Sequence, residues 1–482
     1  MEIITDDMSD KTYTGNLIYD GEEYQFVFFD NNLRLIPVSK EKYSSVLHMG
    51  MKKLPSGAFT IGSPPRVKEN FIIGHCYENY QKIIFLPKKG SYISQKNIVI
   101  FVEVDAYIVF KSDIEAIDKI SFSSPEINCI YPANQAISYT IDIDKTPKNG
   151  TLELHTNSFD QTTTAEQLFS IDGKNIAVSF GISRAISTRI WEPPITTWTN
   201  LVFIFEATND YRFILDLCRL AKQFIQFLCY RRNIKFTKIE LSSPAEKGMH
   251  ETIADLNIIS AGTEDTDLET LKEGRYIKQR YIAGHEGQIL SQIYNNNLYL
   301  RNLPESYSSG QCINAARFIM ITTAFEWEFD KLYPNGIARS QARIDAEETV
   351  SAELNRLIKN SSGKIKRIYN DLLKMSKRSL TLANKIKKVG EDFGNLINPF
   401  GERLYRMNDE QLNYSQMGER IANQRNHFAH GDLDKDFIGL SLLDLIFLER
   451  IIYAMQLKSV GLEDKQIQKA INNLFNCNLA IK

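Results

Sequence analysis

The sequence lacks the features that mark secreted, membrane-spanning and disulfide-bonded proteins. Its N-terminus, MEIITDDMSD, is acidic and has none of the apolar core of a signal peptide. The longest apolar stretch, residues 312–325, is interrupted by Asn314 and Arg317 and is too short to cross a bilayer. Six cysteines are scattered without Cys-x-x-Cys spacing: Cys76, Cys129, Cys218, Cys229, Cys312 and Cys477. We therefore expect a cytoplasmic protein with reduced thiols and no membrane segment.

Motifs for a nucleotide cofactor or a metal are also missing. The chain has neither a Walker-type loop nor a Gly-x-Gly-x-x-Gly motif. The formal charge is only −2; residues 303–482 carry 25 basic and 22 acidic side chains, and residues 1–302 carry 32 and 37. Five histidines lie before residue 302, and no two of them have metal-ligand spacing. They are His48, His75, His155, His250 and His285. We expect no cofactor and no resident metal, and the charge alone identifies no partner.

Residues 11–206 have the pattern of a β-rich region. Runs of Tyr, Phe, Val and Ile are separated by turn residues such as Asp20-Gly21 and Asp30-Asn31-Asn32, which predicts three consecutive strands before residue 38. Further strands are predicted at 71–74, 83–87, 97–110, 136–143, 150–156, 175–183 and 201–206. Many short strands divided by turn residues indicate a sandwich-like module.

After residue 207 the periodicity becomes helical. Residues 211–231 place apolar side chains at helical spacing behind Asn209-Asp210, a plausible helix cap, and this predicts an amphipathic helix packed on the sheet. A strand is predicted at 234–241, and the polar stretch 242–275 is predicted to be a loop region. We assign residues 1–302 to one N-terminal domain.

Residues 303–482 are predicted to form a second, all-α domain. The first long helix, 309–332, is expected to stop at Tyr333-Pro334-Asn335-Gly336. Other helices are predicted at 340–360, 362–389, 408–430, 437–458 and 463–475. Long helices joined by short loops indicate a bundle, so the expected fold class of the whole chain is α+β.

The stretch QRNHFAHGD, residues 424–432, contains side chains suited to RNA cleavage. Arg425 offers a permanently charged planar group for a phosphodiester, and Asn426 adds a hydrogen-bonding amide. His430 can exchange a proton near neutral pH, because an imidazole has an unperturbed pKa of roughly 6.5. RNA brings its own nucleophile, the 2′-hydroxyl, so a base, an acid and a positive charge suffice without a metal.

The spacing of Arg425 and His430 limits how they can meet. At 100° per residue, positions five apart lie roughly 140° apart around a helix. Gly431 is expected to end the helix in a left-handed turn, which would free His430. A two-fold axis could instead bring two copies of both residues into one cleft, where one histidine would be neutral and the other protonated. Both arrangements of Arg425 and His430 fit the sequence. His427 is expected to be a partly buried or surface histidine without a catalytic role.

An Arg, a polar residue and a His at this spacing, on a helix of a small bundle, resemble the signature of the HEPN ribonucleases. Arg425, Asn426 and His430 match that signature residue by residue. The resemblance implies a metal-independent endoribonuclease with a composite site at a homodimer interface. Its products would carry a 2′,3′-cyclic phosphate and a 5′-hydroxyl. The family also tends to have an acid on its first helix, and Glu326, Glu328 and Asp330 remain equal candidates.

The order of a β-rich module and a HEPN bundle resembles the ApeA-type abortive-infection proteins of bacteria. This resemblance implies a role in anti-phage defence, with RNA as the substrate (tRNA is one candidate) and the N-terminal module as a sensor. The trigger would be a phage-derived component or a nucleotide. The alternative is a non-catalytic HEPN protein that dimerises while its β-rich module binds a partner or ligand.

A basic run occupies the predicted helix at 362–389. Between residues 364 and 388 there are nine Lys or Arg and one acid, Asp371. Five of them fall broadly on one helical face and are candidates for RNA backbone contacts: Lys364, Arg367, Lys374, Lys377 and Arg378. A solvated helix face is the other interpretation of this run.

Overall fold

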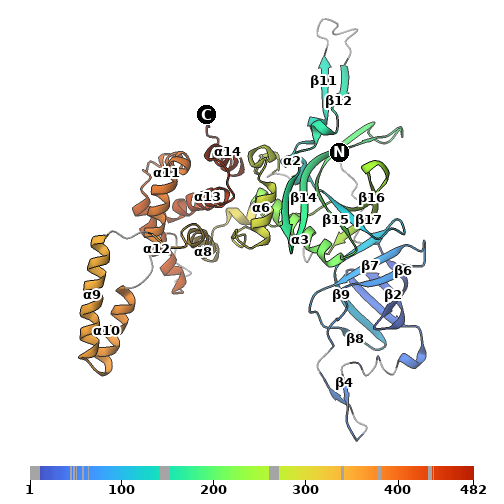
Figure 1. Ribbon diagram of the computed structural model, residues 1–482, viewed down its shortest axis with the longest axis horizontal. Helices are drawn as coiled ribbons and strands as arrows, with labels where there is room; N and C mark the ends of the chain where they lie inside the picture. Colours follow the sequence, from blue (N-terminus) through green and yellow to red (C-terminus); the bar gives the residue numbers. More distant parts are fainter. Residues whose placement is uncertain are drawn as a thin grey trace. The chain divides into compact units, whose positions relative to one another are not determined.

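The structure, a computed structural model, describes residues 11–481 except 44–45, 47–48, 50, 57–58, 63–64, 142–151, 260–270, 338–340, 377–380, 432–436 and 438. Unit 1 comprises Met1–Leu271 and Glu286–Tyr294, and unit 2 comprises Lys272–His285 and Asn295–Lys482. Strands dominate the first unit and helices the second, which confirms the predicted α+β class (Figure 1). The predicted boundary between independently folding domains at residues 302 and 303 stays a prediction.

Unit 1 contains the strands. The first nine are β1 (Tyr13–Tyr19), β2 (Glu22–Phe29), β3 (Asn32–Pro37), β4 (Met51–Lys53), β5 (Phe59–Ile61), β6 (Ile72–Cys76), β7 (Lys82–Pro87), β8 (Ser94–Lys96) and β9 (Val99–Phe110). The others are β10 (Ile117–Ser123), β11 (Ile137–Ile141), β12 (Leu152–Thr156), β13 (Gln167–Ile171), β14 (Lys174–Ile186), β15 (Ile195–Thr208), β16 (Lys238–Pro244) and β17 (His250–Ile258). Its helices are α2 (Pro125–Ile130), α3 (Tyr211–Cys229) and α6 (Glu286–Tyr294).

Thirteen of these strands form one antiparallel sheet that is organised around β9. Six strands pair in the order β9, β3, β2, β1, β6 and β7. Because β7 pairs again with β9, these six strands close into a ring. On the other side, β17 pairs with the second half of β9 and continues the sheet through β16, β10, β15, β14 and β13. The strand β9 is therefore shared by the ring and the open part of the sheet.

Aromatic side chains fill the inside of the six-stranded ring. The Phe28 ring centroid lies 5.0 Å from that of Phe85 and 4.9 Å from that of Tyr107, and all three residues are buried. Strand β2 alternates buried with more exposed residues, as one-sided burial requires. The predicted turns also hold: Asp20 and Gly21, like Asp30 and Asn31, have the positive φ of tight hairpins.

The predicted helix at 211–231 is confirmed as α3. The Asp210 carboxylate accepts a hydrogen bond from the backbone N–H of Phe213 at 3.1 Å and caps the helix. Buried side chains of α3 pack on aromatic residues of the sheet, including Phe213 against Phe205 with centroids 5.6 Å apart. One amphipathic helix therefore covers part of the open sheet.

The sequence-based boundaries after α3 were partly wrong. The strand predicted at 234–241 is β16, Lys238–Pro244, and residues 250–258 of the predicted loop region 242–275 form β17. Pairing with both β16 and β9 supplies the backbone hydrogen bonds of β17, although its sequence has little of the usual strand composition. Strands β10 and β13 were also missed, and residues 142–151, at the ends of two predicted strands, lie outside the described residues.

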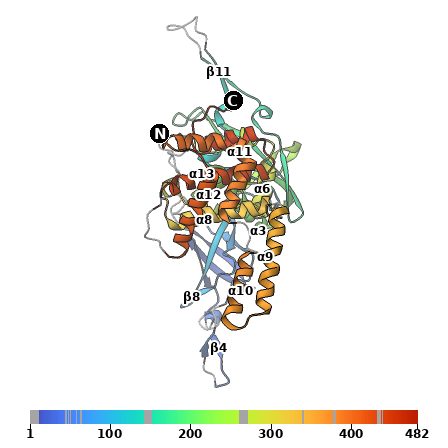
Figure 2. The same cartoon turned by 90° about the vertical axis from the view of Figure 1, so that its left-hand side faces the viewer.

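Unit 2 is helical (Figure 2). Its helices are α5 (Gln279–Ile282), α7 (Tyr307–Gln311), α8 (Ala315–Leu332), α9 (Gln341–Lys359), α10 (Gly363–Ser376), α11 (Leu382–Arg406), α12 (Tyr414–Ala429), α13 (Ser441–Ser459) and α14 (Asp464–Leu474). The central one is α13, whose residues are buried almost all around and which contacts α8, α11, α12 and α14. None of the helices in the described part of the chain is both long and apolar enough to span a membrane.

Two helix predictions in this unit were wrong. The helix expected at 309–332 begins at Ala315, where Asn314 caps it, and the helix expected at 362–389 is divided between α10 and α11. Thr381 caps α11 by accepting from the Asn384 backbone N–H at 3.3 Å.

The missed half of α11, residues 390–406, contains glycines and a proline that weaken its helical pattern. Two of these glycines let rings approach the backbone closely. A Cβ on Gly390 would lie 2.3 Å from the Tyr414 ring, and one on Gly401 would lie 2.5 Å from the Phe447 ring. Packing against α12 and α13 thus requires residues that local propensity disfavours.

A buried carboxylate joins three helices of the bundle. Asp444 on α13 is fully buried and accepts two hydrogen bonds from the guanidinium of Arg420 on α12, from Nε and Nη2, each at 2.7 Å. The hydroxyl of Tyr405 on α11 donates to the same carboxylate. These contacts fix the rotation of α12 about its own axis.

We expect Asp444→Asn to lower the free energy of unfolding of unit 2 by about 2–3 kcal/mol, because it removes a charge-assisted pair of hydrogen bonds to a half-buried guanidinium. Urea unfolding followed by the helical circular-dichroism signal measures this loss. The control is Asp464→Asn, which removes the exposed Lys458–Asp464 pair (2.6 Å) and should cost about 1 kcal/mol or less. Equal losses in both variants would contradict the role given to Asp444.

Candidate active site at the end of helix α12

The C-terminal end of α12 presents the residues singled out in the sequence. The helix ends at Ala429, His430 is its C-cap, and the His430 backbone N–H donates to the carbonyl of Asn426 at 3.0 Å. Gly431 has φ +93°, and its N–H donates to the Phe428 carbonyl at 3.3 Å. The expected left-handed turn at this glycine is confirmed.

Two inward-facing residues hold this end of α12 in place. Phe428 is buried, and its ring lies 5.5 Å from the Phe318 ring and 5.6 Å from the Phe437 ring, centroid to centroid. One helical turn earlier, buried Gln424 accepts a hydrogen bond from the Ser441 hydroxyl at 3.2 Å. Because Gln424 and Phe428 face the core, the residues between and after them are turned towards solvent.

Arg425 forms an ion pair with an acid on the first long helix of the bundle. Its Nη2 lies 2.8 Å from Oε2 of Glu326 on α8, and the two side chains are 34% and 25% exposed. Partial exposure keeps the guanidinium accessible to a ligand, while the carboxylate restricts its orientation. Among the three acids left open by the sequence, Glu326 is the one with a described contact to Arg425.

The other two candidate acids have different environments. Glu328 is buried, and its Oε1 accepts from the Tyr299 backbone N–H at 2.7 Å and from Nε2 of Gln456 at 2.8 Å. Burial raises the pKa of Glu328 to about 7. Asp330 is exposed and pairs with Nζ of Lys385 at 2.7 Å. Both residues stabilise the bundle away from α12.

His430 and Asn426 are exposed, and His427 is half-buried. No hydrogen bond or ion pair within the described residues joins Arg425 to His430. Arg425 turns towards α8, whereas His430 lies beyond the last turn of α12. One copy of the chain therefore carries both groups at the C-terminal part of α12, with no described contact between them.

The basic candidates lie mainly on α10. Lys364, Arg367 and Lys374 are exposed there, and Lys374 is 3.8 Å from the Asp371 carboxylate. Lys377 and Arg378 lie outside the described residues. The later lysines of the run belong to α11, where Lys385 pairs with Asp330 and Lys388 pairs with Asp392 at 2.8 Å. RNA binding by this run stays a prediction.

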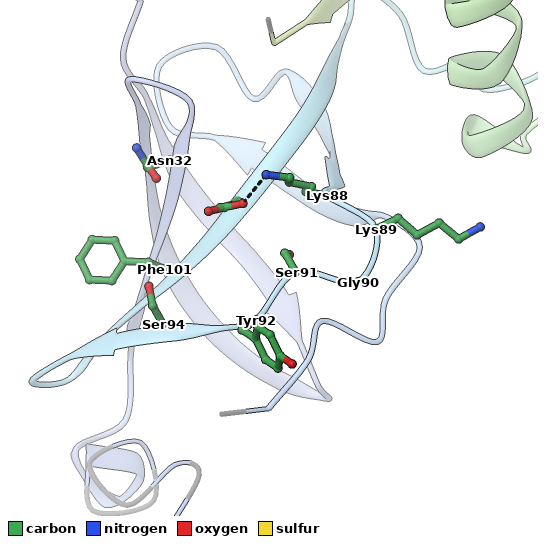
Figure 3. Close-up of a pocket in the computed structure, with 9 residues that line it drawn as sticks. Asn32, Lys88, Lys89, Gly90, Ser91, Tyr92, Ser94 and Phe101 are labelled. Carbon is green, nitrogen blue, oxygen red and sulfur yellow. Dashed lines mark hydrogen bonds and ion pairs between the residues drawn. The ribbon is translucent and has the colours of Figure 1, made fainter. Parts of the chain in front are cut away.

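A second candidate site is a pocket of about 490 Å³ on unit 1, beside the six-stranded ring. It is lined by Asn32, Lys88, Lys89, Gly90, Ser91, Tyr92, Ser94, Phe101 and Glu103. Lys88 is paired with Glu103 at 3.1 Å, and Lys89 extends away from Asn32 and Phe101 (Figure 3). With one lysine neutralised and the other turned outwards, the pocket has no concentrated charge that would specify a ligand.

The match to a known family falls on unit 2. Residues 319–466 match the family model described as Apea-like HEPN. The helical unit contains an Apea-like HEPN domain. This domain runs from α8 into α14 and includes Glu326, Arg425 and His430. Searches of curated proteins and of solved structures gave no match.

The HEPN domain and unit 1 offer no obvious metal centre within the described residues, where no group of three or more His, Cys, Asp or Glu side chains could hold an ion. The six cysteines have no disulfide partner, and Cys76, Cys218, Cys229 and Cys477 are buried. Burial raises the pKa of Cys76 to about 11, which disfavours its thiolate form. The cysteines that the structure describes as buried are thus unsuited to nucleophilic chemistry.

The ionisation of Glu328 predicts a pH dependence of the HEPN domain's stability. Between the ordinary carboxyl value and about 7, the folded domain keeps a proton that the unfolded chain has lost. The stabilisation that the protonated Glu328 gives to the folded domain is therefore complete at the acid end of this pH window. It is lost as the pH rises through about 7. Glu328→Gln cannot ionise, so its stability relative to wild type should increase between pH 5 and pH 8.

Urea unfolding of both proteins at several pH values measures this difference. Asp330→Asn, which changes an exposed acid on the same helix, serves as the control. The outcome against the prediction is a difference in unfolding free energy between wild type and Glu328→Gln that stays the same at every pH. It would show that Glu328 ionises in the folded domain as it does in the unfolded chain.

Proposed function

We propose that this protein is a metal-independent endoribonuclease that acts in bacterial anti-phage defence. The observation that carries the proposal is the ion pair of Glu326 with Arg425, on the helix that the exposed His430 caps, inside the region that matches Apea-like HEPN domains. HEPN domains are generally ribonucleases, and these residues supply a phosphate-binding cation and a group that can exchange protons.

The proposed reaction uses the RNA's own 2′-hydroxyl. A neutral histidine removes the proton from this hydroxyl, and its oxygen attacks the adjacent phosphorus. The bond between phosphorus and the 5′-oxygen breaks, and a protonated histidine donates a proton to that leaving oxygen. Arg425 stabilises the charge that develops on the phosphate. The products are a 2′,3′-cyclic phosphate end and a 5′-hydroxyl end, and no step consumes a cofactor.

Two copies of the HEPN domain complete the proposed site. One chain presents one His430, and the reaction needs a base and an acid at the same phosphate. Across a two-fold axis near the end of α12, a second chain supplies the second His430. Two neighbouring imidazoles repel as cations, so one of them is neutral while the other is protonated over a range of pH.

Glu326 is proposed as a positioning residue that acts through Arg425. The guanidinium has five N–H donors, and the described ion pair engages Nη2. The remaining donors can face a phosphate while Glu326 restricts the rotation of the side chain. Asn426, exposed one residue further along α12, is proposed to orient the substrate or the histidine.

Unit 1 is proposed to sense infection and to restrain the nuclease until a trigger binds. A phage-derived component or a nucleotide is the proposed trigger class, and RNA, with tRNA as one candidate, is the proposed substrate. The support is the presence of a separate β-rich unit before the HEPN domain.

A non-catalytic interaction protein is the second candidate, and the ion pair itself favours it. Because Glu326 neutralises Arg425, the pair could serve only to brace α8 against α12. In that case the HEPN domain would dimerise, unit 1 would bind a partner, and neither Arg425 nor His430 would affect RNA.

We expect Arg425→Ala and His430→Ala to reduce RNA cleavage by the full-length protein at least about 100-fold when extract of phage-infected bacteria supplies the trigger, because each removes a group that acts on the transition state. Wild-type activity should persist in excess EDTA and show a bell-shaped pH–rate profile. Gel assays that detect 5′-hydroxyl and cyclic-phosphate ends measure these effects.

The control is Arg406→Ala, which removes an exposed arginine at the C-terminal end of α11. Loss of cleavage on adding the chelator would refute the metal-free mechanism. Unchanged cleavage in both site variants would favour the non-catalytic candidate.

Glu326→Gln should lower kcat by about 10- to 100-fold with a smaller change in KM, since a misplaced Arg425 harms the transition state more than ground-state binding. Asp330→Asn, one helical turn away on α8, removes a more exposed acid and should leave kcat unchanged. If both variants lose activity equally, or if Glu326→Gln changes only the unfolding midpoint, Glu326 does not position Arg425.

A further inference from the structure

A large aromatic side chain on helix α8 is exposed beside the residues of the candidate active site. Trp327 is 42% exposed and directly follows Glu326, whose carboxylate lies 2.8 Å from the guanidinium of Arg425. Consecutive backbone positions are about 3.8 Å apart, so Trp327 belongs to the immediate surroundings of this ion pair. The proposed cleavage reaction gives its side chain no role.

The Trp327 ring has an aromatic and a basic neighbour. The centroid of the Tyr299 ring lies 6.0 Å from that of Trp327, with an angle of 51° between the ring planes. Nζ of Lys331, one turn later on α8, lies 5.6 Å from the centre of the Trp327 ring and donates to Oδ1 of Asn297 at 3.0 Å. We call Trp327, Tyr299 and Lys331 the aromatic patch.

Two buried side chains of the bundle hold Tyr299 in this position. Oε1 of Glu328 accepts a hydrogen bond from the Tyr299 backbone N–H at 2.7 Å, and Nε2 of Gln456 donates to the Tyr299 carbonyl at 3.2 Å. Glu328 and Gln456 are each 1% exposed and are hydrogen-bonded to each other at 2.8 Å. Tyr299 lies outside the helices, yet the core fixes its backbone, which keeps its ring against Trp327.

The contacts between α8 and α12 place the aromatic patch along the candidate site. The ring of Phe428 contacts that of Phe318 near the start of α8, whereas Arg425, earlier on α12, pairs with Glu326, later on α8. The two helices therefore run in opposite directions. A strand that passes from the histidine at the end of α12 to Arg425 leads on to the C-terminal half of α8, where Trp327 lies.

The charges near the aromatic patch are compatible with a polyanion. Both neighbouring acids of α8 are paired, Glu326 with Arg425 and Asp330 with Lys385 at 2.7 Å. Lys331 donates to a neutral amide, and this contact leaves its positive charge in place. Proteins bind single-stranded nucleic acid with the same combination of an exposed ring and nearby cations.

We propose that the aromatic patch stacks an unpaired base of single-stranded RNA while Arg425 holds a phosphate of the same strand. The base lies on the exposed surface of the Trp327 ring, and Lys331 contacts a neighbouring phosphate. The inference rests on the proposed function, because it takes the proposed substrate as its ligand. It adds that this substrate is unpaired where it meets the site.

The chemistry of the proposed reaction gives the stacking a purpose. Attack by the 2′-hydroxyl requires the leaving 5′-oxygen to lie on the opposite side of the phosphorus, and regular helical RNA does not offer this alignment. The nucleotide at the scissile bond therefore has to leave the helical stack. An aromatic side chain replaces the stacking that the base loses, as in other proteins that bind unpaired RNA.

A second protein fits the aromatic patch less well than RNA does. On α8, whose residues are all described, Met320 and Trp327 are the exposed large apolar side chains. A stable protein interface buries roughly 800 Å² on each partner, which is far more than two partly exposed side chains supply. One ring with an ammonium group beside it matches one base and its phosphate.

The test is retention of the full-length protein on beads that carry single-stranded 2′-O-methyl oligoadenylate. This RNA lacks the nucleophile, so it cannot be cleaved and the result does not depend on catalysis. Retention is measured over a range of RNA concentrations, with and without extract of phage-infected bacteria. Wild type should bind the single strand at least about tenfold more tightly than its duplex with 2′-O-methyl oligouridylate, whose bases are already stacked.

Trp327→Ala should weaken binding of the single strand at least about fivefold and leave binding of the duplex unchanged. Trp327→Phe keeps a flat ring and should stay within about threefold of wild type. The control is Trp191→Ala, which removes an 80% exposed tryptophan from unit 1 and should bind RNA as wild type does. Unfolding midpoints of all variants identify any loss that comes from misfolding.

Photo-cross-linking tests whether the contact with Trp327 is direct. Single-stranded RNA that contains iodouridine is irradiated with wild-type protein, and the labelled peptide is identified by mass spectrometry. The peptide that contains Trp327 should carry the label. Label confined to α10 would place the bound strand on the basic run instead and contradict the proposal.

Three results of the retention assay would overturn the stacking site: no binding of the single strand, no preference over the duplex, or binding that Trp327→Ala leaves unaltered. Any of these in a protein that cleaves RNA through His430 would leave the proposed function standing. Conversely, Trp327-dependent retention in a protein whose cleavage does not need His430 would refute the proposed function and keep the stacking site.

Discussion

The carboxylate of Asp444 determines which side of α12 meets solvent. It lies in the bundle core with no exposed surface, and it receives a two-pronged contact from Arg420 and a hydrogen bond from Tyr405. A buried charge with these partners admits few alternative rotations of the helix. Gln424 and Phe428 then face inwards, and Arg425 reaches Glu326 while His430 stands at the helix end. The geometry of the candidate site follows from this packing.

Helix α8 carries two glutamates, Glu326 and Glu328, whose environments differ. Glu326 and Glu328 are two residues apart, so they point roughly 160° away from each other. One becomes a partly exposed partner of Arg425, and the other is buried against Tyr299 and Gln456 with a raised pKa. Their identical chemistry explains why the sequence could not distinguish them. Only the packing of α8 against α12 and α13 separates the acid that pairs with Arg425 from the buried one.

The features that were predictable from the sequence are those with strong local causes. Hairpin turns at Asp20-Gly21 and Asp30-Asn31, the capped helix α3, and the helix end at Gly431 all follow from short-range backbone preferences.

The errors share one physical origin, which is stabilisation by distant partners. Strand β17 depends on pairing with β16 and β9, and the second half of α11 depends on rings that pack against Gly390 and Gly401. The match to Apea-like HEPN domains agrees with the resemblance drawn from Arg425, Asn426 and His430. The roles of these three residues in catalysis remain a proposal.

The proposed reaction needs two chains at one site. A second His430 is proposed to supply the missing acid or base at the end of α12. The most direct test of its central claim is to sequence RNA 5′-hydroxyl ends in bacteria that express wild type or His430→Ala, with and without phage challenge. The account predicts new ends that appear on challenge with wild type and are absent with His430→Ala. Equal ends in both strains, or none under any challenge, would contradict it.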